Sequence, residues 1–597
     1  MNSISDYPDA SALHHGLLPK RFEAIAANLS ALYPQSGELM LDRLVATLSR
    51  YQPTMPRGEA AAASGCSERD VVLISYGDSI RRGAGRADAE PPLSVLKRFA
   101  DDRLRGAISR IHLLPFFPWS SDDGFSVIDY RAVDPALGGW DEIAALGERF
   151  GLMFDLVLNH CSSQSAWFGQ FATGILPYSR YFMTASPDDD LEAVVRPRTS
   201  PLLTAYETRA GTRHVWTTFS ADQVDLDWSN PDVFFEFLDI ILAYALRGAG
   251  IIRLDAVAFL WKEIGTPCIH LPQTHLIIRI LRQALDLVAP GTLLLTETNV
   301  PHDENVSYFG NGDEAQMVYN FALPPLLLHA LLSADGQWLT QWARALSPPP
   351  AGCMFLNFTA SHDGVGLRPA QGVLPDAEIG RMVERVLAGG GRVATRSLPG
   401  GGESPYELNA TWFSALADGV AQPGEIERRR FLCSQAIALA LAGMPAVYIH
   451  SMFGSLNDTA GVEASGSNRA INRAKLDESE VERWLGDESS HHGRVFRAYH
   501  ELLCRRAGIA ALHPEAYQLV HDCGNSLFVV ERRSRAGRGL LCAHNLSAGE
   551  TRFGLAACGW KSRRLVNRLD DAVLEPVGGE IALGAYEFVW LERAGGR

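Results

Sequence analysis

Four short polar motifs, each directly after an apolar run, contain residue types that could carry out chemistry. They are Asn159-His160, Arg253-Leu254-Asp255, Glu297 and His362-Asp363. Arg253 stands two residues before Asp255, and positions i and i+2 of a strand face the same way. The guanidinium can therefore hold the carboxylate in its ionised form. Taken alone, an acid at a strand end is more often a cap or a solvated loop residue than a functional group.

An ionised carboxylate that acts together with a protonated carboxylic acid suits retaining transfer of a glycosyl group. The carboxylate attacks the anomeric carbon, the acid protonates the leaving oxygen, and two inverting steps give net retention. Asp255 has the neighbouring cation that the nucleophile needs. Glu297 follows the apolar run Leu293-Leu294-Leu295. Burial there would raise its pKa and suit it to the role of the acid.

These motifs need a scaffold that brings distant parts of the sequence together. Eight short apolar runs alternate with helical patterns, which is typical of parallel βαβ units. The runs begin at residues 71, 108, 151, 250, 291, 315, 353 and 443. They predict an α/β fold, a (β/α)8 TIM barrel, whose chemistry lies at the carboxyl ends of the strands. We place the barrel at residues 70–160 and 231–509.

Three further segments flank or interrupt the predicted barrel. Residues 1–69 read as a helical N-terminal extension, with apolar positions at helical spacing in 20–33 and 39–51. Residues 161–230 are too long for an ordinary loop and predict a B subdomain inserted after strand 3, over the active-site face. Residues 510–597 contain short alternating runs and predict a C-terminal β-sandwich domain.

The segments DLVLNH, IIRLDAVAFLWKE, TETNV and TASHDG resemble, in order and spacing, the four motifs of the α-amylase superfamily, glycoside hydrolase family 13. The resemblance implies that Asp255 is the nucleophile and Glu297 the general acid/base. It implies that Asp363 is the third carboxylate, which grips sugar hydroxyls and stabilises the distorted transition state. The other matching sugar-binding positions are His160, Arg253 and His362.

Within that superfamily the chain is similar to the sucrose phosphorylase branch, from about residue 70 to its end. Supporting segments are HLLPFF, DDGFSVIDY, RPRTSPL, TPCIHLPQTH, YNFALPPLLLHAL and NRAINR. By that match Asp122, Phe125 and Arg469 would line the site of the donor glucose. Two alternatives stay open: Asp122 and Asp123 could simply form a turn, and Arg469 could be a surface charge.

A phosphorylase uses inorganic phosphate to release the glucosyl unit, so cations must face its acceptor site. Arg196 and Arg198, in the predicted insert, are candidates because a guanidinium binds phosphate oxygens in a bidentate manner. Structural salt bridges are the alternative for both. Arg368, in the loop 364-GVGLRPAQGVLPD, could meet the acceptor's carboxylate or hydroxyls.

The N-terminal extension, that loop and the stretch 397-SLPGGGESPYELN resemble an extended group that includes glucosylglycerate and glucosylglycerol phosphorylases. The acceptor stays open among sucrose, sucrose 6'-phosphate, glucosylglycerol and glucosylglycerate, with a preference for glucosylglycerate. Two rival functions are a hydrolase, which would use water at the same site, and a non-catalytic carbohydrate-binding relative. The complete set of three carboxylates argues against the second rival.

Composition excludes several other classes of function. The net charge is −15 and no long Lys/Arg run is present, so we expect no nucleic-acid partner. The N-terminus lacks a secretory signal, and no apolar segment approaches the ~20 residues that span a membrane. Nine cysteines without a CxxC pair predict reduced thiols and a cytoplasmic protein. The partners are then a small α-glucoside and inorganic phosphate, and a homodimer is left open.

No cofactor or metal is expected. The sequence has no HExxH motif and no phosphate-binding glycine loop after a strand. The acidic run 188-DDDLE reads as a solvated loop rather than a calcium site, and Cys161, next to His160, is not expected to be catalytic. The runs 388-AGGGR and 399-PGGGES read as flexible loops.

Overall fold

A computed structural model describes residues 18–55, 65–83, 90–398, 402–420 and 422–594 of the chain. Its centre is a closed barrel of parallel strands in which β1 lies between β3 and β16. The strands are β1 (Val72–Ser75), β3 (Arg110–Leu113), β4 (Gly151–Val157), β9 (Ala249–Asp255), β10 (Leu293–Thr296), β11 (Met317–Tyr319), β12 (Met354–Phe358) and β16 (Met444–Tyr448). Each overlaps one of the eight predicted runs, so the TIM barrel is confirmed.

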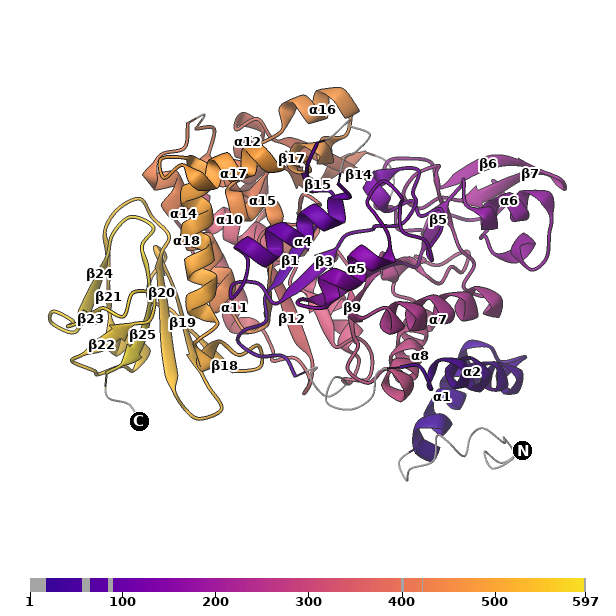
Figure 1. Cartoon of the computed structure of the whole chain (residues 1–597), viewed down its shortest axis with the longest axis horizontal. Helices are drawn as coiled ribbons and strands as arrows, with labels where there is room; N and C mark the ends of the chain where they lie inside the picture. Colours follow the sequence, from indigo (N-terminus) through magenta and orange to yellow (C-terminus); the bar gives the residue numbers. More distant parts are fainter. Residues whose placement is uncertain (1–17, 56–64, 84–89, 399–401, 421, 595–597) are drawn as a thin grey trace.

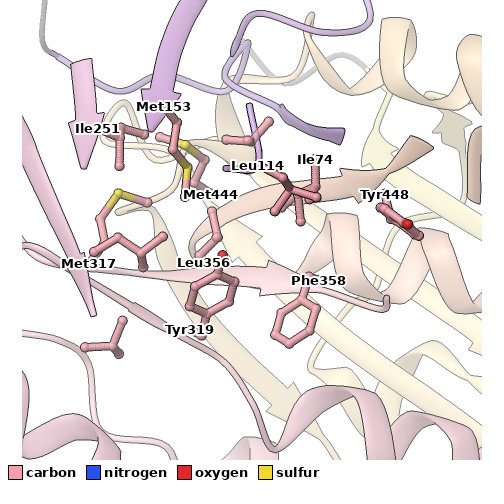
Figure 2. Close-up of a cluster of buried hydrophobic side chains, with 14 of the residues drawn as sticks. Ile74, Leu114, Met153, Ile251, Met317, Tyr319, Leu356, Phe358, Met444 and Tyr448 are labelled. Carbon is pink, nitrogen blue, oxygen red and sulfur yellow. The ribbon is translucent and has the colours of Figure 1, made fainter. Parts of the chain in front are cut away.

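The barrel interior is filled by large apolar side chains rather than left as a pore. Figure 2 shows Met153, Ile251, Met317 and Met444 converging from four different strands, with Leu356 beside them. All five are at most 5% exposed. Such interdigitating layers stabilise the barrel. They also form a rigid floor beneath the polar residues at the strand ends.

Helices surround the barrel and alternate with its strands (Figure 1). They include α4 (Pro92–Arg103), α5 (Trp140–Gly147), α7 (Pro231–Leu246), α8 (Pro272–Val288), α10 (Leu323–Ser333), α14 (Glu425–Ala440) and α18 (His491–Arg506). Helices α4, α7 and α8 begin with proline, which suits a first helical position that needs no backbone donor. No helix in the described ranges is long and apolar enough to cross a membrane.

The segment between β4 and α7 forms a small lobe beside the carboxyl ends of the strands. It contains β5 (His160–Ser162), α6 (Ala166–Thr173), the hairpin of β6 (Leu203–Thr208) and β7 (Gly211–Trp216), and β8 (Gln223–Asp225). Strand β5, which follows β4 in the chain, pairs with β8, so the first and last strands of the lobe lie together. A separate apolar cluster of Val194, Leu202, Trp216 and Cys268 anchors it.

The predicted helical extension forms α1 (Leu18–Leu32) and α2 (Gly37–Tyr51), which pack against α7 and α8 at one end of the molecule (Figure 1). The buried residues Ile25, Leu29 and Leu44 belong to the same core as the barrel helices. The Tyr33 hydroxyl donates to the Trp228 carbonyl at 3.0 Å. Residues 1–17 and 56–64, which belong to the predicted extension, lie outside the described residues.

The other end of the molecule is a β domain (Figure 1). Its six-stranded sheet consists of β18 (Tyr517–His521), β19 (Leu527–Arg533), β20 (Gly539–Asn545), β22 (Leu565–Asn567), β23 (Val573–Leu574) and β25 (Phe588–Arg593). A second, two-stranded sheet joins β21 (Thr551–Gly554) to β24 (Glu580–Leu583). Side chains of both sheets share one apolar core, for example Val529, Leu541, Phe553 and Leu583.

The stretch 388-AGGGR, predicted as a flexible loop, runs from the end of α12 (Asp376–Ala388) through a turn into β14 (Arg392–Ser397). Strands β13 (Val365–Gly366), β15 (Glu403–Asn409) and β14 form a three-stranded sheet in that order. Gly390, at φ +83°, makes the turn that glycine permits. Residues 399–401 of the second glycine run lie outside the described residues.

Candidate functional site

A pocket opens at the carboxyl ends of the barrel strands. Its lining includes almost every residue that the sequence singled out: Asp122, Phe125, His160, Arg198, Arg253, Asp255, Glu297, His362, Asp363, Arg368 and Arg469. Arg196 is not part of this lining. The residues come from separate segments of the barrel, the inserted lobe and the later loops, so only the closed fold brings them together.

Asp255, the last residue of β9, accepts a hydrogen bond at Oδ1 from Nη1 of Arg253 at 2.7 Å. The same Nη1 lies 2.5 Å from Oδ1 of Asp155 on the neighbouring strand β4. Asp155 is in turn 2.7 Å from Nε2 of His112 on β3. All four side chains are buried, so three adjacent strands fix the orientation of the Asp255 carboxylate through one polar chain.

Glu297 follows β10 at the level of Asp255, since Leu295 pairs with Arg253 and Thr296 with Leu254. Its Oε2 accepts a hydrogen bond from the Ala256 backbone N–H at 3.1 Å. Ala256 has φ +50°, an uncommon conformation for a residue with a side chain. Such strain is typically kept at functional sites. This turn gives Glu297 a hydrogen-bond donor from the residue directly after Asp255.

The two carboxyls differ in their neighbours. Burial, followed by the charges of nearby carboxylates, raises the pKa of Asp255, and Arg253 opposes that shift. Burial likewise raises the pKa of Glu297, which has no guanidinium bonded to it among the described residues. Two coupled acids of this kind can share one proton at neutral pH. Arg253 opposes the rise at both acids, but of the two it is hydrogen-bonded to Asp255, and this contact favours the anion on Asp255.

Asp363 is surrounded by cations. Its Oδ1 lies 2.6 Å from Nη1 of Arg469 and 3.5 Å from Nη2 of Arg473. Burial alone would raise the pKa of Asp363, but the two arginines hold it below its usual value. Arg469 also bonds the buried carboxylate of Glu407 at 2.8 Å. Asp363 is therefore held by the two arginines in a position and an environment that favour its ionised form.

Aromatic rings line the pocket beside these acids. Phe125 stacks on the His362 ring, with 4.9 Å between ring centroids and 4° between planes. His160 bonds the Phe125 carbonyl through Nε2 at 3.0 Å. Burial lowers the pKa of both histidines, and for His362 the charges of Arg473 and Arg253 lower it further. Neutral imidazoles next to an apolar ring suit a sugar, which offers both hydroxyls and C–H faces.

Asp122 and Asp123 do form a turn, and Asp122 also lines the pocket. Both have left-handed backbone conformations, at φ +54° and +49°. The turn places Asp123 at 2.6 Å from Nη1 of Arg473. Asp122 lies 3.7 Å from the same nitrogen and 4.0 Å from Nη1 of Arg469. The motif therefore forms a turn, and Asp122 in that turn also lines the pocket.

The arginines predicted for phosphate and acceptor lie in different surroundings. The Arg198 guanidinium lies 5.8 Å from the Phe219 ring centroid and 5.4 Å from that of Tyr406, in the wall of the pocket. Arg368 also lines the pocket, and its nearest carboxylate in the described ranges is Glu304 at 3.9 Å. The Arg196 guanidinium instead bonds the Ser200 carbonyl within its own loop. A side chain used in that way is not directed to the pocket.

Sequence reasoning missed three polar residues that the pocket depends on. Asp155 interrupts an apolar strand, which is a signal that could have been followed. Arg473 stands four residues after Arg469, and the short helix Asn468–Asn472 brings both to Asp363. Glu407 lies on β15, a strand with no apolar alternation, so no signal in the sequence marks it.

Among the described residues near this site, neither a metal-binding group nor a reactive thiol is found. In the ranges that the structure describes, no group of three or more His, Cys, Asp or Glu side chains could hold a metal ion. Cys161 is fully buried behind the pocket, and burial raises the pKa of its thiol to about 12. A protonated thiol is a poor nucleophile.

The family model "alpha amylase, catalytic domain" matches residues 106–345. A glucosylglycerate phosphorylase of Spirochaeta thermophila is 43% identical over 94% of this chain and 97% of its own length. One of Allomeiothermus silvanus is 46% identical over 84% of this chain and 89% of its own length. Among solved structures, a sucrose 6F-phosphate phosphorylase from Thermoanaerobacter thermosaccharolyticum matches with a TM-score of 0.70 and 23% identity, over 81% of this chain and 95% of that one.

Proposed function

Because the chain belongs to the alpha-amylase family, we propose that it is a retaining sugar phosphorylase that acts on glucosylglycerate. The observation that carries this proposal is its identity of 43% and 46% to two glucosylglycerate phosphorylases, over most of both chains. The proposed reaction converts glucosylglycerate and inorganic phosphate into glycerate and α-D-glucose 1-phosphate. The pocket geometry supports a covalent glucosyl-enzyme on the way.

In the first step an Asp255 oxygen forms a bond to the anomeric carbon while the bond from that carbon to the glycerate oxygen breaks. Glu297 gives its proton to the departing oxygen and becomes a carboxylate. The contacts of Arg253 with Asp255, and of the Ala256 N–H with Glu297, support these two roles. Positive charge develops at the sugar ring, and the fixed negative charge of Asp363 would stabilise it.

In the second step a phosphate oxygen bonds the anomeric carbon and the bond to Asp255 breaks, which returns the electron pair to that carboxylate. The proton of hydrogen phosphate passes to Glu297 and restores the starting enzyme. Arg198 is the proposed phosphate ligand because it lines the pocket without an ion-pair partner among the described residues. We no longer assign this role to Arg196, whose guanidinium bonds Ser200.

The donor site in this proposal comprises Asp122, Phe125, His160, His362 and Arg469. A neutral histidine donates or accepts single hydrogen bonds to hydroxyls, whereas Asp122 accepts them. Phe125 offers its face to the C–H side of the ring. The arrangement fits an uncharged hexose and does not depend on a cofactor.

We propose that the protein works in the cytoplasm, in carbohydrate metabolism, as a monomer or homodimer. The nine cysteines form no disulfide in the described structure and six of them are buried thiols, which supports a reducing compartment. The small partners are the α-glucoside and phosphate. The strongly acidic net charge of −15 gives no support to a nucleic-acid partner.

The test measures glucose 1-phosphate and free glucose with phosphate present and absent, from glucosylglycerate, glucosylglycerol, sucrose and sucrose 6'-phosphate. We expect phosphate-dependent glucose 1-phosphate, with the highest kcat/KM for glucosylglycerate. Free glucose released at the same rate with or without phosphate would identify a hydrolase and overturn the proposal. A higher kcat/KM for a different glucoside would retain phosphorolysis but replace the acceptor.

A further inference from the structure

The hairpin of β14 and β15 carries a guanidinium that the sequence did not single out, that of Arg396, which is not part of the pocket lining but lies next to residues that are. Arg396 lies on β14, opposite Ser404 on β15. Two residues further along β15, Tyr406 lines the pocket wall together with Arg198 and Arg368. Arg396 is close enough to Arg368 for that positive charge to act on it.

The cations at this wall of the pocket are poorly matched by acids. Among the described residues, no carboxylate lies within ion-pair distance of Arg198 or Arg396, and Arg368 meets only Glu304, at 3.9 Å. Nε of Arg368 and Nε of Arg396 are buried and have no hydrogen-bond partner in the same ranges. In a chain of net charge −15, these three guanidiniums have a single ion pair among the described residues. This is the arrangement expected where an anion binds.

The positive charges of this cluster favour binding of an anion. Burial, and then the neighbouring charge of Arg368, lower the pKa of Arg396. Two like charges that are partly removed from water destabilise one another. An anionic ligand between them would replace this repulsion with two charge-assisted interactions. Binding of an anion would therefore relieve the repulsion between these two arginines.

The cluster has an inner and an outer part. Arg198 lies beside the Tyr406 ring, and the neighbouring residue Glu407 bonds Arg469, the ion-pair partner of Asp363. Arg368 lies 3.9 Å from Glu304, whose side chain is 43% exposed, and the pKa of Arg396 is lowered by burial and then by the charge of Arg368. The inner cation is thus near the donor sugar, and the outer pair is further away.

Ligand chemistry distinguishes these two positions. In an attacking phosphate, the charged oxygens share the phosphorus atom with the oxygen that meets the anomeric carbon. In a glucosylglycerate, at least one carbon separates the glycosidic oxygen from the carboxylate carbon, whichever hydroxyl carries the sugar. The carboxylate of the acceptor therefore reaches further from the donor sugar than the phosphate oxygens do.

We propose that Arg396 and Arg368 form the binding site for the carboxylate of the acceptor and thereby determine specificity for a carboxylated acceptor. This inference rests on the proposed function, since it concerns the acceptor end of the same pocket. Arg198 is left to bind phosphate. The two anions then bind different cations of one pocket, so that glycerate can leave and phosphate can enter the same site.

The test uses Arg396→Gln and Arg368→Gln, with Arg392→Gln as a matched control that removes one charge from the same strand β14. Two donors are compared at saturating phosphate: glucosylglycerate and α-D-glucosyl fluoride, whose leaving group has no carboxylate. We expect each of the first two variants to lower kcat/KM for glucosylglycerate by about 10- to 100-fold, which is the loss typical of a charged hydrogen bond. Turnover of glucosyl fluoride should change less than about threefold.

Binding of D-glycerate, measured by calorimetry, gives a readout that does not depend on turnover. We expect a similar loss of affinity in both variants and none in Arg392→Gln. An unchanged affinity for glycerate, or an equal loss for both donors, would overturn the inference. So would an increase confined to the KM for phosphate, which would assign the pair to phosphate instead. Failure of the wild type to release glucose 1-phosphate from any donor would overturn the proposed function, while glycerate binding would still decide this inference.

Discussion

The donor end and the acceptor end of the pocket are built in different ways. At the donor end, Asp255, Glu297 and Asp363 each have fixed partners from neighbouring strands or helical turns. At the acceptor end, Arg198 lies on a loop, Arg368 begins the short 3-10 helix Arg368–Ala370, and both have few partners. The difference separates two functions. The barrel strands position the carboxylates proposed to carry out the reaction. The later segments position the arginines proposed to determine which anion binds.

The most disruptive change at the donor end is Asp255→Asn. The amide keeps the shape of the side chain but cannot form the covalent intermediate, so we expect kcat to fall by at least about 10⁴-fold. Thermal unfolding should change little, because Arg253 keeps Asp155 as a partner. Steady-state assays with glucosylglycerate and a melting curve test this. Full activity in a folded Asp255→Asn protein would rule out Asp255 as the nucleophile.

Replacing Glu297 with glutamine should cost less, and the cost should depend on the leaving group. For glucosylglycerate we expect kcat/KM to fall by roughly 10²- to 10⁴-fold, because the departing oxygen needs a proton. For α-D-glucosyl fluoride the glucosylation step should be far less affected. Rates measured with both donors distinguish this role from a structural one, which would lower both equally.

Glu297→Gln also makes a prediction about pH. Burial raises the pKa of Glu297, so the wild type should stay active well above the ordinary range of a glutamate and lose kcat/KM as pH rises through the raised value. The acid form is the active one, hence the loss is on the alkaline side. In Glu297→Gln, tested with glucosyl fluoride, this alkaline loss should disappear. A profile with the same alkaline loss would assign it to another group.

At the acceptor end we expect a smaller and more selective effect. Arg198→Gln should raise the KM for phosphate by about 10- to 100-fold, the loss of one charged hydrogen bond. Arg196→Gln is the matched control, because its guanidinium is bonded to Ser200 two positions beyond Arg198. Phosphate titrations of both variants at fixed glucosylglycerate make the comparison. Equal effects in the two variants would remove the distinction drawn between these arginines.

Glu407 connects the two ends, and its replacement should have the smallest effect of the series. The carboxylate bonds Arg469, which in turn bonds Asp363, while the adjacent Tyr406 faces Arg198. Glu407→Gln keeps one hydrogen bond but loses the charge, so we expect a drop in kcat/KM of roughly tenfold or less. The KM for phosphate should stay within about threefold of the wild type. A selective change in that KM would place Glu407 with the acceptor end instead.

The sequence predicted the barrel well because each strand is an apolar run that ends in polar residues. The strand ends Asp255 and Glu297 were visible for the same reason. The positive φ of Ala256, which turns its N–H toward Glu297, cannot be recognised from residue types. This backbone conformation depends on the closed barrel.

The acceptor end was less predictable for a physical reason. Strand β14, with the sequence RVATRS, has no buried face in the described structure and shows no apolar alternation. Its pairing with β15 is decided by tertiary contacts over the pocket. Arg196 and Arg198, only two residues apart, look equivalent in sequence, yet a turn directs one to Ser200 and the other to the pocket wall. Side-chain direction in loops cannot be read from spacing.

The central claim, transfer of a glucosyl unit through Asp255 to phosphate, has one direct measurement. The Glu297→Gln protein is mixed with α-D-glucosyl fluoride without phosphate, and peptides are analysed by mass spectrometry before and after phosphate is added. We expect one glucosyl unit on the peptide that contains Asp255, and its conversion to α-D-glucose 1-phosphate once phosphate is present. A glucosyl unit on another residue, or an adduct released by water at the same rate as by phosphate, would contradict the account.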